Sequence, residues 1–289
     1  MSAAPTDHPL AAWDNPPAIA PRGTVIVVPG RGEHPALYGR FGQRISADAY
    51  LVRAVGDPAQ DPDAVAAQIR ALLNDPALPA PRVLAGSDGG ALFAVALAAG
   101  GADVDGLVLA GLPVTGAPAA PPGEGSSEIE ARTSCPTHGR LLGSDPGFRP
   151  GALNEPLPDA WFDAADLSRV TVPVLGLHGR SDTVSPFDAA RERYAEGANV
   201  ELYALAEGPH DALNDRNHRV AAATVLLFLE RLRLGAALPE IAVRELPGPG
   251  PASTPGPVPT PGTTPAAATA AATVPAAGSA AGSGEVSGR

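Results

Sequence analysis

Short apolar runs alternate along most of this chain with longer amphipathic segments, and that alternation limits the folds available to it. In the short runs both alternating positions are apolar, which is typical of strands covered by helices on both faces. Strands and helices in alternation favour an α/β fold with a mostly parallel sheet. The predicted strands are 24–28, 50–55, 82–85, 106–110, 172–177 and 200–204, and the predicted helices are 38–49, 63–73, 90–99, 186–195 and 214–234.

The alternation is interrupted once, between about residues 112 and 170. This stretch is rich in Pro and Gly and contains one short predicted helix, 159–166. Long excursions within a compact domain are usually lids or binding loops, so we expect a cap over the site. Trp161 in this cap is a candidate substrate contact, although a single Trp there more often packs a cap onto a core. Cys135 and His138, also in the cap, have too few neighbouring ligands for a metal site.

The two ends of the chain differ in composition from its centre. Residues 247–289 are almost wholly Pro, Ala, Gly, Thr and Ser, with Glu285 and Arg289 as the only charged side chains. This composition buries too little apolar surface to fold and predicts a disordered tail. The remaining length suits one domain. We therefore predict an N-terminal extension at 1–22, an α/β domain at 23–246 and the tail at 247–289.

Charge and residue usage exclude several classes of function. The net charge is −11, which argues against nucleic acid and anionic lipid as partners and leaves a small-molecule substrate. All 20 basic residues are Arg, so chemistry that needs a lysine amine is excluded. The single Cys135 forms no intrachain disulfide. Without a signal-peptide pattern or a long apolar run, we expect a cytoplasmic protein that uses no metal or cofactor.

Residues 82–91 run from an apolar strand through small residues into a helix. A nucleophile at such a strand-to-helix turn needs small neighbours two residues away on either side, because backbones crowd the turn. Ser87 has Ala and Gly at these positions, and Asp88 has Gly at both. The spacing therefore permits either residue as nucleophile. A Gly-rich turn with a Ser N-cap and no catalytic role has the same pattern.

Two further candidates follow later predicted strands. Asp182 lies just after the strand at 172–177, and His210 lies after the strand at 200–204. Sites in parallel sheets gather at the carboxyl ends of the strands. A hydroxyl nucleophile needs an imidazole to take its proton and a carboxylate to orient that imidazole. The order Ser87, Asp182, His210 supplies all three groups.

The loop after the first predicted strand is a second glycine-flanked segment at the same sheet edge. Its backbone N–H groups, notably that of Arg31, are candidates to form an oxyanion hole with the N–H that follows the nucleophile. A tight turn without a catalytic role is the alternative. Candidate oxyanion or substrate-binding residues are Arg31, Gly30, Asp88 and Gly89.

With these loops in place, the chain resembles the α/β-hydrolase superfamily, specifically its monoacylglycerol lipase and serine aminopeptidase-like branch. The resemblance covers residue 23 to about 234 and implies a hydrolase of small esters, thioesters or amides. It implies Ser87 as nucleophile, His210 as base and Asp182 as orienting acid, with the Arg31 and Asp88 amides as oxyanion donors. The matching segments are Pro-Gly-Arg-Gly-Glu-His at 29–34 with Tyr38, Ser-Asp-Gly-Gly-Ala at 87–91, Asp182 with Pro186, and His-Asp-Ala-Leu-Asn at 210–214.

Two departures keep alternatives open. Pro29 stands where the branch has His, and Ala85 stands where Gly usually precedes a nucleophile at position 87. A shift by one residue makes Asp88 the nucleophile, as in haloalkane dehalogenases and epoxide hydrolases. Those relatives usually place Trp where this chain has Gly89, and epoxide hydrolases use cap tyrosines that 112–170 lacks.

We therefore carry three hypotheses. The first is a serine hydrolase with Ser87, Asp182 and His210. The second is a hydrolase with Asp88 as nucleophile and the same two partners. The third is a non-catalytic binding protein on the same fold.

Overall fold

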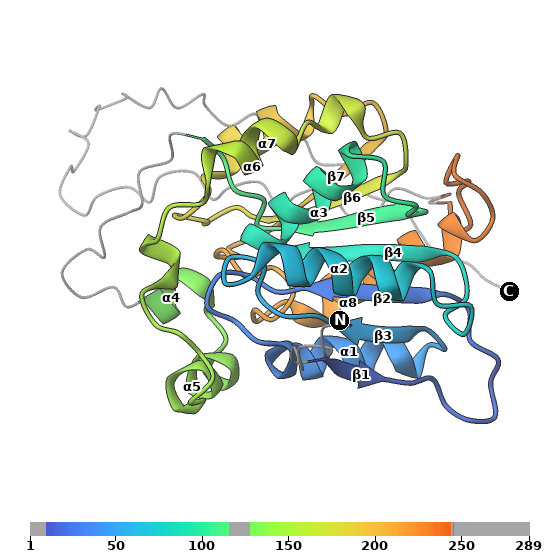
Figure 1. Cartoon of the computed structure of the whole chain (residues 1–289), viewed down its shortest axis with the longest axis horizontal. Coiled ribbons are helices and arrows are strands. Elements are labelled where there is room, and N and C mark those ends of the chain that lie inside the picture. The colour runs from blue at the N-terminus through green and yellow to red at the C-terminus, as the bar shows by residue number, and fades with distance from the viewer. Residues whose placement is uncertain (1–9, 116–127, 244, 246–289) are drawn as a thin grey trace, which may run out of the picture. The chain divides into compact units, whose positions relative to one another are not determined.

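A computed structural model describes residues 10–115, 128–243 and 245 of this chain (Figure 1). The chain divides into two units, residues 1–242 and 243–289, and the described residues fall almost wholly in the first. The predicted tail at 247–289 lies outside the described residues.

Among the described residues, one sheet contains seven strands. Their order is β1-β3-β2-β4-β5-β6-β7, and every neighbouring pair is parallel except β1 with β3. The predicted α/β class with a mostly parallel sheet is confirmed. The strands are β1 (Ala11–Trp13), β2 (Thr24–Val28), β3 (Leu51–Ala54), β4 (Arg82–Ser87), β5 (Gly106–Ala110), β6 (Val174–Gly179) and β7 (Val200–Leu205).

Helices cover both faces of this sheet (Figure 1). Alternate residues of β2 show the division, because Val25 and Val27 pack with α1 and α8 whereas Ile26 and Val28 pack with α2 and α3. All four are fully buried, as the two-sided apolar pattern predicts. The helices on the sheet are α1 (Gly39–Ala47), α2 (Pro62–Leu73), α3 (Gly89–Ala99), α7 (Phe187–Tyr194) and α8 (His218–Leu232).

The interruption after β5 holds short helical elements. In the described part of this cap the chain turns into helix several times without adding a strand to the sheet. Only α6 lies where the sequence predicts a helix. The elements are α4 (Glu128–Arg132), α5 (Pro136–Ser144), α6 (Asp159–Ala164) and the 3₁₀ turns Ala152–Asn154 and Leu167–Arg169, with a further 3₁₀ turn, Pro35–Tyr38, before α1.

Strand β1 lies within the segment predicted as an N-terminal extension. It pairs antiparallel with β3, so residues 11–13 form the edge of the sheet. Trp13 packs closely on α1, where a Cβ at Gly42 would lie 2.3 Å from the Trp13 ring. A strand of three residues is too short to produce a recognisable alternation in the sequence.

None of the described helices is both long and apolar enough to span a membrane.

Candidate active site

Asp88 occupies the apex of the turn between β4 and α3. Its backbone has φ 48° and ψ −125°, a strained conformation that is uncommon for a residue with a side chain. The preceding residue, Ser87, is still the last residue of β4. The structure therefore places the aspartate at the position that a nucleophile occupies in a strand-turn-helix elbow.

Glycines on both sides of Asp88 allow this turn. A Cβ at Gly86 would lie 2.4 Å from the carbonyl oxygen of Gly90, and a Cβ at Gly90 would lie 2.2 Å from the carbonyl oxygen of Val28. Both contacts are with backbone, which cannot move aside easily. The crowded positions are thus two residues before and two residues after Asp88. The corresponding positions around Ser87, residues 85 and 89, are not crowded by backbone in this way.

The side chain of Ser87 points elsewhere. Successive side chains of a strand alternate between its faces, so Ser87 shares the face of Ala85, which packs with the α1 and α8 layer. There Ser87 is buried and interacts with the hydroxyl of Tyr38. The predicted pairing of Ser87 with His210 is not found, and Asp88 contacts His210 instead.

His210 connects Asp88 with Asp182. Its Nε2 lies 3.1 Å from Asp88 Oδ1, and its Nδ1 lies 2.8 Å from Asp182 Oδ2. The other oxygen of Asp182 accepts the backbone N–H groups of Val184 (2.8 Å) and Ser185 (2.9 Å). Asp182 and His210 therefore lie in contact, as the sequence predicts. The third member of the group is Asp88, where the serine hypothesis expects Ser87.

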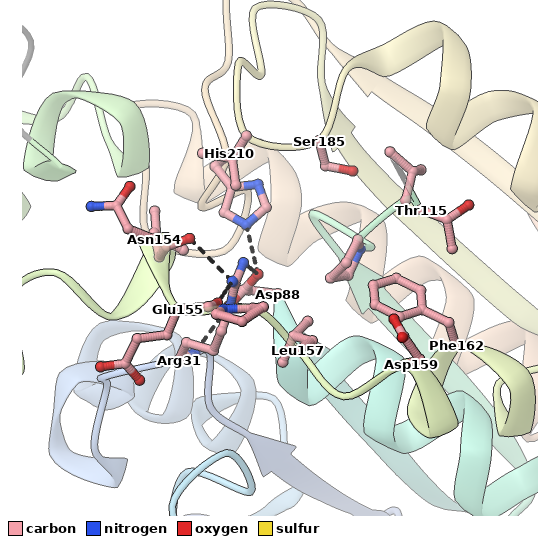
Figure 2. Close-up of a pocket in the computed structure, with 15 residues that line it drawn as sticks. Arg31, Asp88, Thr115, Asn154, Glu155, Leu157, Asp159, Phe162, Ser185 and His210 are labelled. Carbon is pink, nitrogen blue, oxygen red and sulfur yellow. Dashed lines mark hydrogen bonds and ion pairs between the residues drawn. The ribbon is translucent and has the colours of Figure 1, made fainter. Parts of the chain in front are cut away.

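Arg31 binds Asp88 from the opposite side (Figure 2). Its Nε donates to Asp88 Oδ2 and its Nη2 donates to Oδ1, each at 2.8 Å, and its backbone N–H also donates to Oδ2 at 3.0 Å. A two-pronged bond between arginine and carboxylate is among the stronger pairings in proteins. The Arg31 amide, which the sequence predicts as an oxyanion donor, here donates to Asp88 itself, and the sequence did not predict a role for the Arg31 side chain.

These contacts fix the charges of the site. Burial opposes ionisation of Asp88, but the charges and hydrogen bonds of Arg31 and His210 together outweigh it and hold the pKa of Asp88 well below its ordinary value. Burial likewise opposes ionisation of Asp182, and attraction by His210 keeps the pKa of Asp182 low. For His210, burial lowers the pKa, whereas the two carboxylates raise it more strongly, to about 10. At neutral pH the resting site therefore alternates in sign as Arg31⁺, Asp88⁻, His210⁺ and Asp182⁻.

A cavity of about 290 Å³ opens onto Asp88 and His210. Figure 2 shows Asp88 between Arg31 and His210 on one side of it, with Thr115, Asp159 and Phe162 on the other. Loop and cap residues form much of the wall, so the cap covers the site. Its lining residues are Arg31, Asp88, Pro113, Val114, Thr115, Leu153, Asn154, Glu155, Pro156, Leu157, Asp159, Phe162, Val184, Ser185 and His210.

The other predicted contacts have different surroundings. The N–H of Gly30 donates to the Tyr38 hydroxyl (3.1 Å) and to Glu33 (3.3 Å), so it does not serve the cavity. Gly89 lies beneath the cap, where an added Cβ would be 3.1 Å from the Leu157 side chain. Trp161 packs on Phe93 of α3 with ring centroids 5.0 Å apart, and it is the neighbouring Phe162 that lines the cavity.

Helix α4 holds two loops of the site in place. The guanidinium of Arg132 is almost completely buried and donates to the carbonyl oxygen of Arg31 (2.6 Å) and to Glu33 Oε1 (3.0 Å). The backbone N–H of His210 donates to the carbonyl oxygen of Ala131 at 3.2 Å. One short cap helix thus contacts both the Arg31 loop and the His210 loop.

Some of these residues had a signal in the sequence and others had none. Gly111, directly after β5, has φ 56°, and a Cβ there would lie 2.5 Å from the carbonyl oxygen of His210. The glycine at this position is therefore the sequence signal for the close approach of the His210 loop to the end of β5. Arg132, Phe162 and Thr115 lie in the irregular cap, where no periodicity indicates which side chain faces inward. Across 10–115, 128–243 and 245, no group of three or more His, Cys, Asp or Glu side chains is placed to hold a metal ion.

Solved structures share this fold. The chain is similar to a monoacylglycerol lipase from Paleococcus ferrophilus, with TM-score 0.62 and 18% identity over 79% of this chain and 99% of that one. It is also similar to a soluble variant of monoglyceride lipase from Saccharomyces cerevisiae, with TM-score 0.62 and 15% identity over 77% and 91%. A carboxyl esterase from Bacillus coagulans gives TM-score 0.58 and 18% identity over 81% and 97%.

No protein-family model and no curated protein matches the sequence. The structural likeness shows the α/β-hydrolase fold, so the predicted fold is confirmed, and monoacylglycerol lipases are among the proteins that share it. Because one fold hosts many activities, the chemistry has to be argued from the site itself.

Proposed function

We propose that this chain is a hydrolase whose nucleophile is the carboxylate of Asp88, acting on small molecules with a leaving group on a saturated carbon. The observation that carries the proposal is the contact of Asp88 Oδ1 with His210 Nε2 at 3.1 Å, at the apex of the elbow. The lipases and esterases that share the fold support the broader class, a hydrolase. The presence of aspartate instead of serine at the apex supports the narrower class, a hydrolase with a carboxylate nucleophile.

In the first half of the reaction, Asp88 Oδ1 attacks the carbon and forms an ester bond to it. The bond to the leaving group breaks, and its electron pair departs with that group. No base is needed, because the low pKa of Asp88 keeps the nucleophile ionised. Attack on a saturated carbon suits a carboxylate, whose esters are stable enough to serve as intermediates.

In the second half, water hydrolyses the ester. Esterification removes the charge of Asp88, so the pKa of His210 falls and the imidazole releases its proton to solvent. Neutral His210 then takes a proton from water as the hydroxide attacks Cγ of Asp88, and Asp182 stabilises the imidazolium that forms. Collapse of this adduct expels the alcohol, which takes the proton from His210. Asp88 is left as a carboxylic acid, and its proton passes to His210, which restores the resting charges. The net change adds water to the substrate and releases the alcohol, the leaving group and a proton.

The cavity favours small, partly apolar substrates. Its volume of about 290 Å³ is at the lower end of ligand pockets. Leu157, Phe162 and Pro113 supply apolar wall, whereas Asn154 and Thr115 supply polar groups beyond Asp88. We propose a short haloalkane as the substrate class.

The composition supports two accompanying proposals. The single Cys135 fits a reducing, cytoplasmic compartment, and the net charge of −11 fits a small-molecule substrate in preference to nucleic acid.

Activity of paired variants tests the proposal. Asp88→Asn should abolish hydrolysis across a panel of haloalkanes, and Ser87→Ala should retain it, because Ser87 faces away from His210. A fluorophosphonate should label neither residue, as mapped by peptide mass. Labelling at Ser87, with ester hydrolysis that survives Asp88→Asn, would instead support a serine hydrolase. Saturable binding without turnover would support a binding protein.

A further inference from the structure

We propose that the guanidinium of Arg31 is a catalytic group for the second half of the reaction, where it stabilises the oxyanion that forms when water attacks the Asp88 ester. This inference rests on the proposed function and adds a side chain to a role that the sequence analysis predicted only for backbone N–H groups. Three features of the structure support it: which oxygen of Asp88 Arg31 holds, how it is fixed, and where its charge lies.

The first feature is that the two carboxylate oxygens of Asp88 have different sets of hydrogen-bond partners. Oδ1 lies 3.1 Å from His210 Nε2 and accepts one Arg31 donor, Nη2 at 2.8 Å, and it is the oxygen that attacks in the proposed reaction. Oδ2 accepts the Arg31 backbone N–H at 3.0 Å and the Arg31 Nε at 2.8 Å. After alkylation at Oδ1, Oδ2 is the carbonyl oxygen of the ester and gains the negative charge when water adds to Cγ. The donors are already at hydrogen-bond distance from that atom.

The second feature is that the guanidinium is held rigidly. Its Nη1 donates to the carbonyl oxygens of Leu153 (3.1 Å) and Glu155 (2.6 Å) in the cap. Its own backbone carbonyl accepts Arg132 Nη2 at 2.6 Å, and the residue is only 7% exposed. A group fixed from two sides does not reorganise as charge develops, which is the condition for effective electrostatic catalysis.

The third feature is the balance of charge. In the resting site the Arg31 cation is matched by Asp88, and this pair is buried. Once Asp88 is an ester, Arg31 is a buried cation beside a neutral carbonyl, and formation of the oxyanion restores its partner. Interactions that are stronger in the transition state than in the preceding state are the ones that accelerate a step. The same unmatched cation also disfavours protonated His210 and so promotes its action as a base.

The inference predicts that loss of the Arg31 charge separates the two halves of the reaction. In Arg31→Gln, Asp88 remains a carboxylate and still reacts with an alkyl halide, but the alkyl-enzyme accumulates because its hydrolysis slows about 10²-fold or more. The probe is 1-bromobutane, and the readout is the intact mass of the protein over time. Arg149→Gln, which breaks a surface pair with Glu155, is the matched control and should turn over as the unchanged chain does.

His210→Gln separates this inference from the proposed function, since it should also trap the alkyl-enzyme on Asp88 whatever the role of Arg31. Trapping in both variants supports the inference. Trapping in His210→Gln alone, with normal turnover in Arg31→Gln, overturns it. Slowing of alkylation and hydrolysis by the same factor in Arg31→Gln also overturns it, because that is the result of a purely structural role.

Two further measurements complete the test. Absence of alkylation in all of these proteins overturns the proposed function, and this inference with it. If Arg31→Gln does not fold, as judged by circular dichroism, Arg31→Ala is assayed with guanidinium ion in solution. Rescue of ester hydrolysis by guanidinium, with no effect on alkylation, supports the inference, and failure to rescue a folded variant contradicts it.

Discussion

At the scale of single residues, charge alternation along Arg31, Asp88, His210 and Asp182 determines what the site does. Each group is buried, and each lies beside a neighbour of opposite sign. An isolated buried charge is costly, so neutralising any one member changes the ionisation of the next. The proposed reaction uses this property, because in that proposal alkylation of Asp88 converts His210 from an acid to a base.

The pKa of His210 predicts a loss of stability in alkaline solution. Burial lowers this pKa, but Asp182 and Asp88 raise it more strongly, from its ordinary value of 6.5 to about 10 in the folded chain. Protonation therefore stabilises the fold fully below pH 6.5 and ceases to do so as the pH rises through about 10. Denaturant unfolding between these values should show a decline of a few kcal/mol in the free energy of unfolding. His210→Gln should remove most of that decline, and an unchanged slope would contradict the assignment.

The backbone at the elbow makes a second prediction. Gly90→Ala places a Cβ 2.2 Å from the Val28 carbonyl oxygen, so the turn or the sheet must shift. We expect a loss of about 3 kcal/mol or more in unfolding free energy, together with lost activity. Gly56→Ala is the matched control, because its nearest contact would be an ordinary 3.6 Å to the Val65 side chain. Equal stability of the two variants, measured by thermal unfolding, would show that the elbow is not crowded as described.

At the scale of elements, helix α4 contributes more to the site than its five residues suggest. Through Arg132 and the carbonyl of Ala131 it contacts the loops that carry Arg31 and His210. The cap is therefore part of the catalytic arrangement as well as a cover over it.

Arg132→Met tests this role of α4. The substitution leaves Glu33 buried and removes the bond to the Arg31 carbonyl, so it should cost about 3–5 kcal/mol of unfolding free energy. Arg149→Gln on the surface should change it by less than about 1 kcal/mol. Comparable effects in the two variants, measured by denaturant titration, would mean that Arg132 does not hold the loops.

The elements that the sequence predicted are those with a repeating pattern. Strands β2, β4, β5 and β6 have apolar residues on both faces, and α8 has an apolar stripe, so their positions follow from periodicity. In β3 and β7 polar residues interrupt this pattern, at Arg53 and at Glu201 respectively. Strand β1 and helices α4 and α5 are short and are held by tertiary contacts, so no local pattern marks them. The choice between Ser87 and Asp88 as nucleophile is a shift of one residue along the chain. Because both residues have small neighbours two positions away on either side, the sequence left that choice open.

At the scale of the whole molecule, strand order explains why distant residues form one site. The loops after β2, β4, β6 and β7 all leave the carboxyl edge of the parallel sheet, and they carry Arg31, Asp88, Asp182 and His210 respectively. This is where open α/β sheets place their ligands. The fold and the edge were predictable from the sequence, whereas the Arg31 side chain entered the site through tertiary packing that periodicity does not encode.

The central claim is that the substrate becomes bonded to Asp88, and oxygen-18 labelling tests it directly. Excess enzyme completes a single turnover of 1-bromobutane in labelled water, and the peptide containing Asp88 is analysed by mass spectrometry. Water attacks Cγ of Asp88 in this account, so the label should enter the Asp88 carboxylate while the first alcohol carries unlabelled oxygen. Labelled alcohol with unlabelled Asp88 would contradict it.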